Sequence, residues 1–464
     1  MENDKYLQVL IEKLKTYGSR EQRLYGWVVA ISKQVSYQRL LYPDTSQTLI
    51  PETIRNNINA VSYVLTVYTR TGDPQTMGMM YVKIDPLKSV EEQIEAAVTG
   101  ALAVKNTPWE LVTPELAGEY RSPAMADPAI LADPVAAADK IVRMASDTCN
   151  TLEGVHVNYS ELFVTMAESL RITSTGLRMR KKASSIYYEI AMEKLPLPNR
   201  QEIHNNKNSL SIEGLQIDRF IRQAAEEARV LGSVEVPETD EKAVILVQGD
   251  VINSIFHCLL EQIDVSREYT KRPYLKLEEK IYRGELLKDT DLVNLQLDPF
   301  IDYMAESTPY TKEGLNPAAG IVIENSTIRQ HYVSYRMSQY LNRPRNPVSG
   351  NIVLDCGTAS YAELTRSEPR VIEILTFSSL LLNSDYLTYS SEIKLAREFD
   401  NTKGTVRYLK GGVVSGSIRE NFCSCRFSNN RVKCNTFDGI YNETRAYLGP
   451  EYMLVRTGVA ISGK

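Results

Sequence analysis

The sequence predicts an α+β fold in two domains, a mixed helix and antiparallel-sheet domain followed by a β-rich one. The chain has 464 residues, more than the roughly 100–200 residues of a single compact domain. Apolar residues make up 43% and charged residues 24%, as in ordinary folded proteins. Helical and alternating apolar patterns mix in the first half, whereas the second half is mostly strand-like and rich in Val, Ile, Tyr and Thr.

Local signals place the elements of the first half. Two β-rich runs at 61–67 and 78–84 flank a turn at Gly72-Asp73-Pro74. A helix follows Ser89, which forms a capping box with Glu92. Further expectations are an opening helix capped by Asn3 or Asp4, a long connection over 106–134, a helix after Asp133-Pro134, antiparallel strands over 155–192 and a helix at about 214–231.

The domain boundary is expected just after that last helix. Gly232 ends its apolar pattern, Pro237 follows, and the stretch 238–241 is acidic. We therefore predict domains at 1–236 and 237–464. The second domain should open with a strand at 243–247 and a helix at about 250–262.

Charge and composition disfavour several classes of function. With 53 basic and 58 acidic residues the net charge is −5, so broad binding to nucleic acid is not expected. The most basic cluster, Arg178, Arg180, Lys181 and Lys182, has the ordinary interpretation of a solvated strand face. No stretch approaches the ~20 apolar residues of a membrane span. The acidic start does not resemble a signal peptide, and six cysteines are few, which favours a cytoplasmic protein.

Common catalytic signatures are missing from the sequence. It has neither the GxxxxGK[ST] phosphate loop nor a GxGxxG turn between a strand and a helix. The run from Gly412 to Gly416 has its serine in the fourth place, whereas a nucleophile elbow needs Gly-x-Ser-x-Gly. We interpret this run as a glycine-rich strand or bulge. No catalytic residue is predicted.

Metal-ligand spacing is also weak. The four histidines are too far apart in sequence for an HExxH or HExxxH helix. His257 and Glu261 lie one turn apart on the 250–262 helix, a spacing that could supply two ligands, but a polar-face histidine with a helix-surface neighbour is the favoured interpretation. Cys434 belongs to a C-x-C-x8-C cluster with Cys423 and Cys425 that lacks a nearby fourth ligand. No metal or cofactor site is predicted, and these residues remain weak candidates.

Several segments resemble the TldD/PmbA metallopeptidase family, in family order from about residue 160 onward. They are SLRITSTGLRMR (169–180), RPRNPVSGNIVLDCGTASYAEL (343–364), KGGVVSGSI (410–418) and the closing GPEYMLVRTGVAISGK. DYLTYSSEIKLAREF (385–399) stands where the family has its TGDFS strand, but matches it poorly. The resemblance implies an α+β N-terminal domain and a β-rich C-terminal domain of the TldD/PmbA type.

The resemblance also implies which of two subtypes the chain is. TldD-like members carry HExxxH and a later cysteine and bind zinc, whereas PmbA-like (TldE-like) members lack these ligands and pair with TldD. In this chain Gly249, Asp250 and Ser254 fall where the histidines and glutamate would be, and Cys434 lies loosely near the cysteine position. Without those ligands no zinc-activated water is available.

We therefore expect a PmbA/TldE-like subunit that assembles with a TldD-like zinc peptidase, or with itself as a dimer, in the proteolysis or maturation of peptides. Members of this family are also labelled modulators of DNA gyrase, which the acidic charge does not support. Two alternatives stay open: a stand-alone hydrolase with an atypical zinc site that uses His257, Glu261, His331 or the cysteines, and a homodimeric peptide-binding protein without catalysis.

Overall fold

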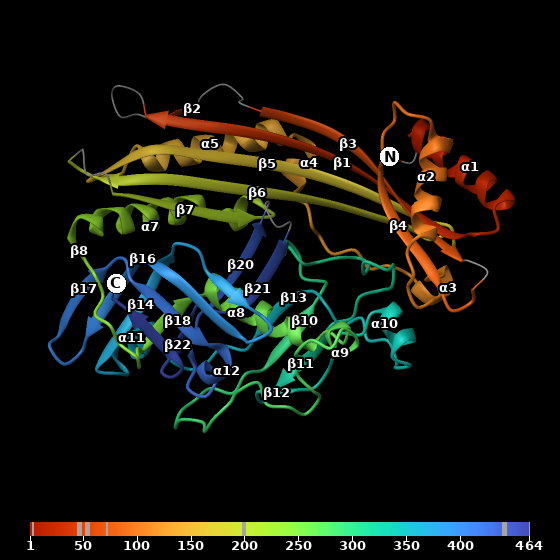
Figure 1. Cartoon of the computed structure of the whole chain (residues 1–464). Coiled ribbons are helices and arrows are strands. Elements are labelled where there is room, and N and C mark those ends of the chain that lie inside the picture. Colours follow the sequence, from red (N-terminus) through yellow and green to blue (C-terminus); the bar gives the residue numbers. More distant parts are fainter. Residues whose placement is uncertain are drawn as a thin grey trace.

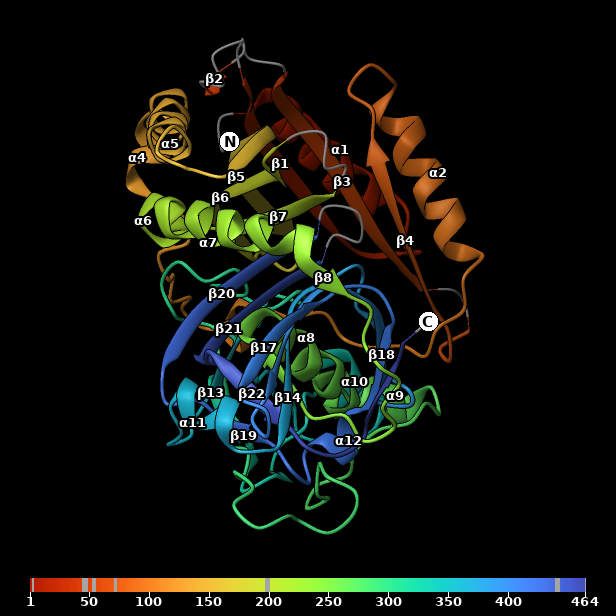
Figure 2. The same ribbon diagram turned by 90° about the vertical axis from the view of Figure 1, so that its left-hand side faces the viewer.

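The computed structural model shows a long antiparallel sheet lying over a second part built from two further sheets (Figures 1 and 2). It describes residues 1, 4–43, 49–51, 56–70, 73–196, 201–438 and 443–463. No helix among these residues is long and apolar enough to cross a membrane. Asn3 and Gly72, which the sequence suggested as a cap and a turn residue, lie outside the described residues.

The first sheet has seven antiparallel strands in the order β4-β3-β1-β5-β6-β7, with β2 paired to β1. The predicted strands at 61–67 and 78–84 are confirmed, and the predicted antiparallel run over 155–192 is one long hairpin of β5 and β6. The strands are β1 (Leu24–Pro43), β2 (Leu49–Pro51), β3 (Asn56–Arg70), β4 (Met77–Ile84), β5 (Val155–Thr173), β6 (Arg178–Lys194) and β7 (Glu202–Ser209).

Four helices cover one face of this sheet, in two pairs. Leu162 and Val164 of β5 pack with α5 and α7, and Leu170 and Ile172 of the same strand pack with α1 and α2. Because alternate residues of a strand share a face, both helix pairs lie on the same face. The helices are α1 (Lys5–Arg20), α2 (Val90–Leu102), α5 (Pro134–Cys149) and α7 (Ile217–Val230). Figure 1 shows α1 and α2 at one end of the long strands.

Most of the predicted helix starts are confirmed. The side chains of Asp4, Ser89 and Asp133 accept backbone N–H bonds at the starts of α1, α2 and α5. The helix expected at 214–231 is instead two helices, because Gln216 adopts a left-handed conformation with φ of 46° between them. The expected long connection at 106–134 contains two short helices. These shorter elements are α3 (Pro114–Ala117), α4 (Pro128–Ala132), α6 (Ile212–Leu215) and the 3-10 turn η1 (Leu231–Ser233).

The second part places helix α8 (Gly249–Leu260) between two sheets, because its apolar residues share one core with strands of both. The six-stranded sheet has the order β12-β11-β10-β13-β21-β20. Its strands are β10 (Leu295–Asp298), β11 (Gly320–Glu324), β12 (Thr327–Ile328), β13 (Asn351–Leu354), β20 (Arg431–Asp438) and β21 (Glu443–Pro450).

The ten-stranded sheet has the order β19-β22-β9-β14-β16-β17-β8, and β15, β18 and β23 extend it beside the first half of β16. Its strands are β8 (Val234–Glu235), β9 (Ile245–Gln248), β14 (Arg370–Phe377), β15 (Leu381–Asn383), β16 (Thr388–Asp400), β17 (Thr405–Leu409), β18 (Val413–Ser417), β19 (Arg426–Phe427), β22 (Tyr452–Val455) and β23 (Val459–Ser462). The glycine-rich run at 412–416 thus lies largely within strand β18, as predicted. Short helices η2 (Glu261–Ile263), α9 (Ser266–Tyr269), α10 (Tyr335–Tyr340), α11 (Tyr361–Arg366) and α12 (Ile418–Asn421) complete this part.

The two parts meet on the face of the first sheet that the helices leave free, and also beside α7, whose core includes Leu395 of β16. Met179 of β6 packs with Tyr310 and Leu315, and Lys181 Nζ donates to the Ser307 carbonyl at 3.2 Å. Lys181 of the basic cluster is therefore half-buried against the second part rather than on a solvated face. Its pKa is lowered by burial. Strand β8 lies just before residue 237 and already pairs with β17 of the ten-stranded sheet.

Candidate functional site

The first turn of α8 is where the sequence resemblance places the residues that stand in for zinc ligands. The turn is closely packed against strands β20 and β21. A Cβ atom at Gly249 would lie 2.8 Å from Val432 Cγ2, 3.2 Å from Cys434 Sγ and 3.6 Å from Tyr447 Cε1. Such short contacts require glycine here unless neighbouring side chains shift. Cys434, which the sequence placed only loosely, thus lies directly beside the start of α8.

Ionisable groups from both parts of the molecule gather around this turn. Burial raises the pKa of the Cys434 thiol to about 12, and the Asp250 carboxylate adds to that rise while the Lys207 ammonium opposes it. Lys207 comes from β7, and burial lowers its pKa. Neighbouring protein atoms displace water from around the Asp250 carboxyl group and so raise its pKa, although the residue is still partly exposed to solvent.

Glu227 of α7 faces the same region from the first part. Its carboxylate accepts hydrogen bonds from Asn205 Nδ2 at 2.8 Å and Gln223 Nε2 at 3.2 Å, and a weaker one from Thr376 Oγ1 at 3.4 Å. Burial raises the pKa of Glu227 despite these bonds, and the Asp250 charge adds to the rise. The turn therefore combines a protonated thiol, two carboxyl groups with raised pKa values and a half-buried lysine.

The His257/Glu261 pair, a weak candidate for two metal ligands, is not formed. His257 Nε2 lies 3.1 Å from Glu306 Oε2, and the Glu306 carboxylate also accepts the Ala446 N–H at 2.9 Å. Glu261 instead pairs with Arg267 Nη2 at 2.7 Å. His257 is eight residues beyond Gly249, which places it about 12 Å further along the helix axis than the turn beside Cys434. The sequence favoured a neighbour of His257 on the surface of the same helix, and this was wrong. Its neighbour is Glu306, which lies in the connection between β10 and β11.

The remaining candidates are also dispersed. Cys423 and Cys425 follow α12, where their thiols donate to the carbonyls of Arg283 at 3.0 Å and Asp291 at 3.5 Å. His331 Nε2 lies 2.7 Å from the Leu275 carbonyl oxygen. Within the described part of the chain, no three His, Cys, Asp or Glu side chains are grouped as metal ligands.

The donor set at the start of α8 does not suit zinc. Catalytic zinc takes three protein ligands, with imidazole prominent, and binds cysteine as the thiolate. This turn offers no imidazole and has glycine where a ligand would project, so Cys434 lies there without the partner ligands that a zinc centre needs. The groups present can hold protons and form hydrogen bonds, but they do not make a Lewis-acid centre.

Lys207, Glu227 and Glu306 are not among the residues that the sequence predicted for a site. Each reaches the α8 region from an element far away in sequence, so no spacing rule could connect them. Glu227 alone had a local signal in the sequence, because it is a charged residue on the otherwise small and apolar buried face of α7.

Comparison with known proteins identifies the fold. No protein-family model matches the sequence, and no curated protein matches it significantly. Among solved structures, a "putative modulator of DNA gyrase" from Bacteroides thetaiotaomicron is similar with a TM-score of 0.77 and 15% identity, over 100% of this chain and 99% of that one. TldE from Thermococcus kodakarensis gives 0.74 and 16%, over 98% and 100%.

A protein of the same description from Thermotoga maritima gives a TM-score of 0.72 and 14% identity, over 98% of this chain and 99% of that one. At such identities the likeness is one of fold. It spans every sheet described above and agrees with the resemblance read from the sequence. The chain has, along essentially its whole length, the TldD/PmbA-type fold of TldE and of these two proteins.

Proposed function

We propose that this protein is the non-catalytic, TldE-like subunit of a two-chain peptidase whose other chain is a TldD-like zinc enzyme. The observation that carries the proposal is the first turn of α8. The sequence resemblance puts Gly249, Asp250 and Ser254 in the places of the zinc-binding motif, and Cys434 lies against Gly249, where no ligand side chain projects. The full-length fold similarity to TldE supports the same assignment.

Other described residues do not supply the missing zinc ligands at this turn. A peptidase of this type needs a metal to polarise the carbonyl and to lower the pKa of water. His257 and Glu261 lie about 12 Å or more along α8 from the turn beside Cys434, and Glu261 is paired with Arg267, so neither is available to that thiol. The chain would then serve the pair by shaping the space into which peptide substrates pass. A cytoplasmic location accompanies this proposal.

The proposal is tested by co-expressing the chain with a TldD-like protein from the same genome. Light scattering after size exclusion should show a complex heavier than the 52.4 kDa single chain, and elemental analysis should place the zinc in the partner. Replacing the glutamate of the partner's HExxxH motif should abolish peptide cleavage. Asp250→Asn in this chain should leave both assembly and cleavage intact.

Three results would contradict this function. The first is about one zinc per chain in the protein purified alone, together with peptide cleavage. The second is loss of cleavage in an intact complex that carries Asp250→Asn, which would assign this chain a catalytic carboxylate. The third is a stable homodimer that binds no TldD-like protein, which would favour the alternative of a peptide-binding dimer.

A further inference from the structure

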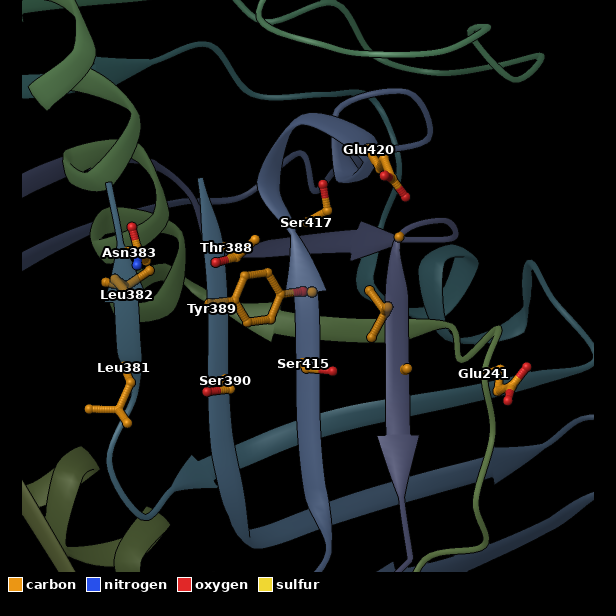
Figure 3. Close-up of a pocket in the computed structure, with 14 residues that line it drawn as sticks. Glu241, Leu381, Leu382, Asn383, Thr388, Tyr389, Ser390, Ser415, Ser417 and Glu420 are labelled. Atoms are coloured by element: carbon orange, nitrogen blue, oxygen red, sulfur yellow. The ribbon is translucent and has the colours of Figure 1, made fainter. Parts of the chain in front are cut away.

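A groove of about 810 Å³ lies on the outer face of strands β15, β16, β18 and β23, away from the first turn of α8. Figure 3 shows its two unlike sides: leucines of β15 lie at one side, two glutamates at the other, and hydroxyl side chains between them. Its volume falls within the roughly 300–1,000 Å³ typical of small-molecule sites. Nothing in the proposed function uses this groove.

The floor of the groove is made of hydroxyl side chains in register. Ser390 is paired with Ser415, and Thr388 with Ser417, across β16 and β18. The intervening Tyr389 belongs to the buried core, so these four alternate residues face outward. No described residue forms a hydrogen bond with their hydroxyl groups, and each hydroxyl can both donate and accept.

The charge of the groove is of one sign. Glu241 and Glu420 line it, and none of its lining residues is a lysine or arginine. Neither carboxylate forms an ion pair with a described residue, whereas Asp240 next to Glu241 lies 3.5 Å from Arg370. The groove therefore offers two free carboxylates to a cationic ligand.

The spacing of the two glutamates selects among cations. Glu420 Oε2 would lie 3.2 Å from a Cβ at Gly458, and Glu241 follows Asp240, which is bridged to Ile461. Three residues along β23 correspond to about 10 Å. An inorganic cation needs six or more oxygen atoms within about 2.6 Å, which two carboxylates so far apart do not provide. An extended organic cation can reach both.

We propose that the groove binds a linear polyamine, with one ammonium group at each glutamate and its methylene chain over the small side chains of the floor. The N–H groups of such a ligand need only acceptors, which the serine and threonine hydroxyls supply. Ala460, which pairs with Ser415, adds only a methyl group to the floor and so leaves the flat space that a methylene chain requires. Leu381, 66% exposed, adds an apolar contact at the far side.

Isothermal titration calorimetry of spermidine into the full chain at low ionic strength tests this site. Saturable binding of one ligand per chain is expected. It should weaken about tenfold in Glu241→Gln/Glu420→Gln, because two partly exposed ion pairs are lost. The single variants should each lose part of the affinity. Glu285→Gln, which removes an exposed carboxylate outside the groove, is the matched control and should bind like the parent chain.

Thermal melting of each variant verifies that it is folded. Absence of saturable spermidine binding overturns the proposal, as does an affinity that Glu285→Gln lowers as much as the double variant. Binding of an oligolysine peptide but not of spermidine also overturns it. Because no partner chain takes part, failure here leaves the proposed subunit role untouched.

Discussion

Replacing Gly249 by alanine tests the packing at the start of α8. The added Cβ would lie 2.8 Å from Val432 Cγ2 and 3.2 Å from Cys434 Sγ, closer than carbon and sulfur contacts normally allow. Overpacking of this kind costs about 1–3 kcal/mol. Replacing glycine within a helix returns at most about 1 kcal/mol, and less at the first helical residue. We expect Gly249→Ala to lower the free energy of unfolding by about 1–2 kcal/mol.

Urea unfolding followed by circular dichroism measures this change, and Val432→Ala supplies the control. Val432→Ala alone should cost about 1 kcal/mol, because the side chain is half-buried. In the double variant the clash is relieved, so its cost should fall below the sum of the two single costs by at least about 1 kcal/mol. A Gly249→Ala protein more stable than the parent, or strictly additive costs, would refute the packing argument. The same crowding predicts that histidine at 249 cannot restore a zinc ligand without moving β20.

Three further predictions concern ionisable groups. The pKa of Glu227 is raised in the folded state, so its contribution to stability is fully present below the unfolded pKa and is lost as pH rises through the folded pKa. Urea unfolding across about pH 4–8 should show this decline in the parent chain. The decline should be smaller in Glu227→Gln, which has no carboxyl group to titrate. Arg267 is 4% exposed and pairs with Glu261 and Asp385 at 2.7 and 2.6 Å, so Arg267→Ala should lower the free energy of unfolding by about 2–3 kcal/mol, and an unchanged urea midpoint would contradict this. The Cys434 thiol, with a pKa of about 12, should react with Ellman's reagent at pH 8 far more slowly in the native chain than after denaturation, and equal rates would show that it is not enclosed.

Local sequence signals predicted the elements whose causes are local. Ser89 and Asp133 accept backbone bonds as expected, because a cap depends on residues only two or three positions away. The 20-residue strand β1 was not predicted, since its central residues Lys33 and Gln34 are exposed and interrupt the apolar alternation. Its partners β3 and β5 hold it in place through pairing that no window of the sequence displays.

The candidate site was predictable only in part. The family resemblance located Gly249, Asp250 and Ser254, and the structure places Cys434 beside the first of them. Lys207 and Glu227 arrive through the packing of β7 and α7 against the second part of the molecule. Such convergence depends on tertiary contacts between distant segments, which charge patterns and helical spacing do not encode.

The long strands of the first sheet have a consequence for folding. Strand β5 has 19 residues and so runs about 60 Å, and it contributes Leu162 to the core under α5 and α7 and Leu170 to the core under α1 and α2. The same strand, β5, thus contributes to both cores. Strand β1 does the same, with Ile31 in one core and Leu41 in the other. If the strands separate at one end of the sheet, the backbone hydrogen bonds of the same strands are weakened toward the other end. The sheet and its four helices should melt as one cooperative unit, and hydrogen exchange should show matched protection at the two ends of β5.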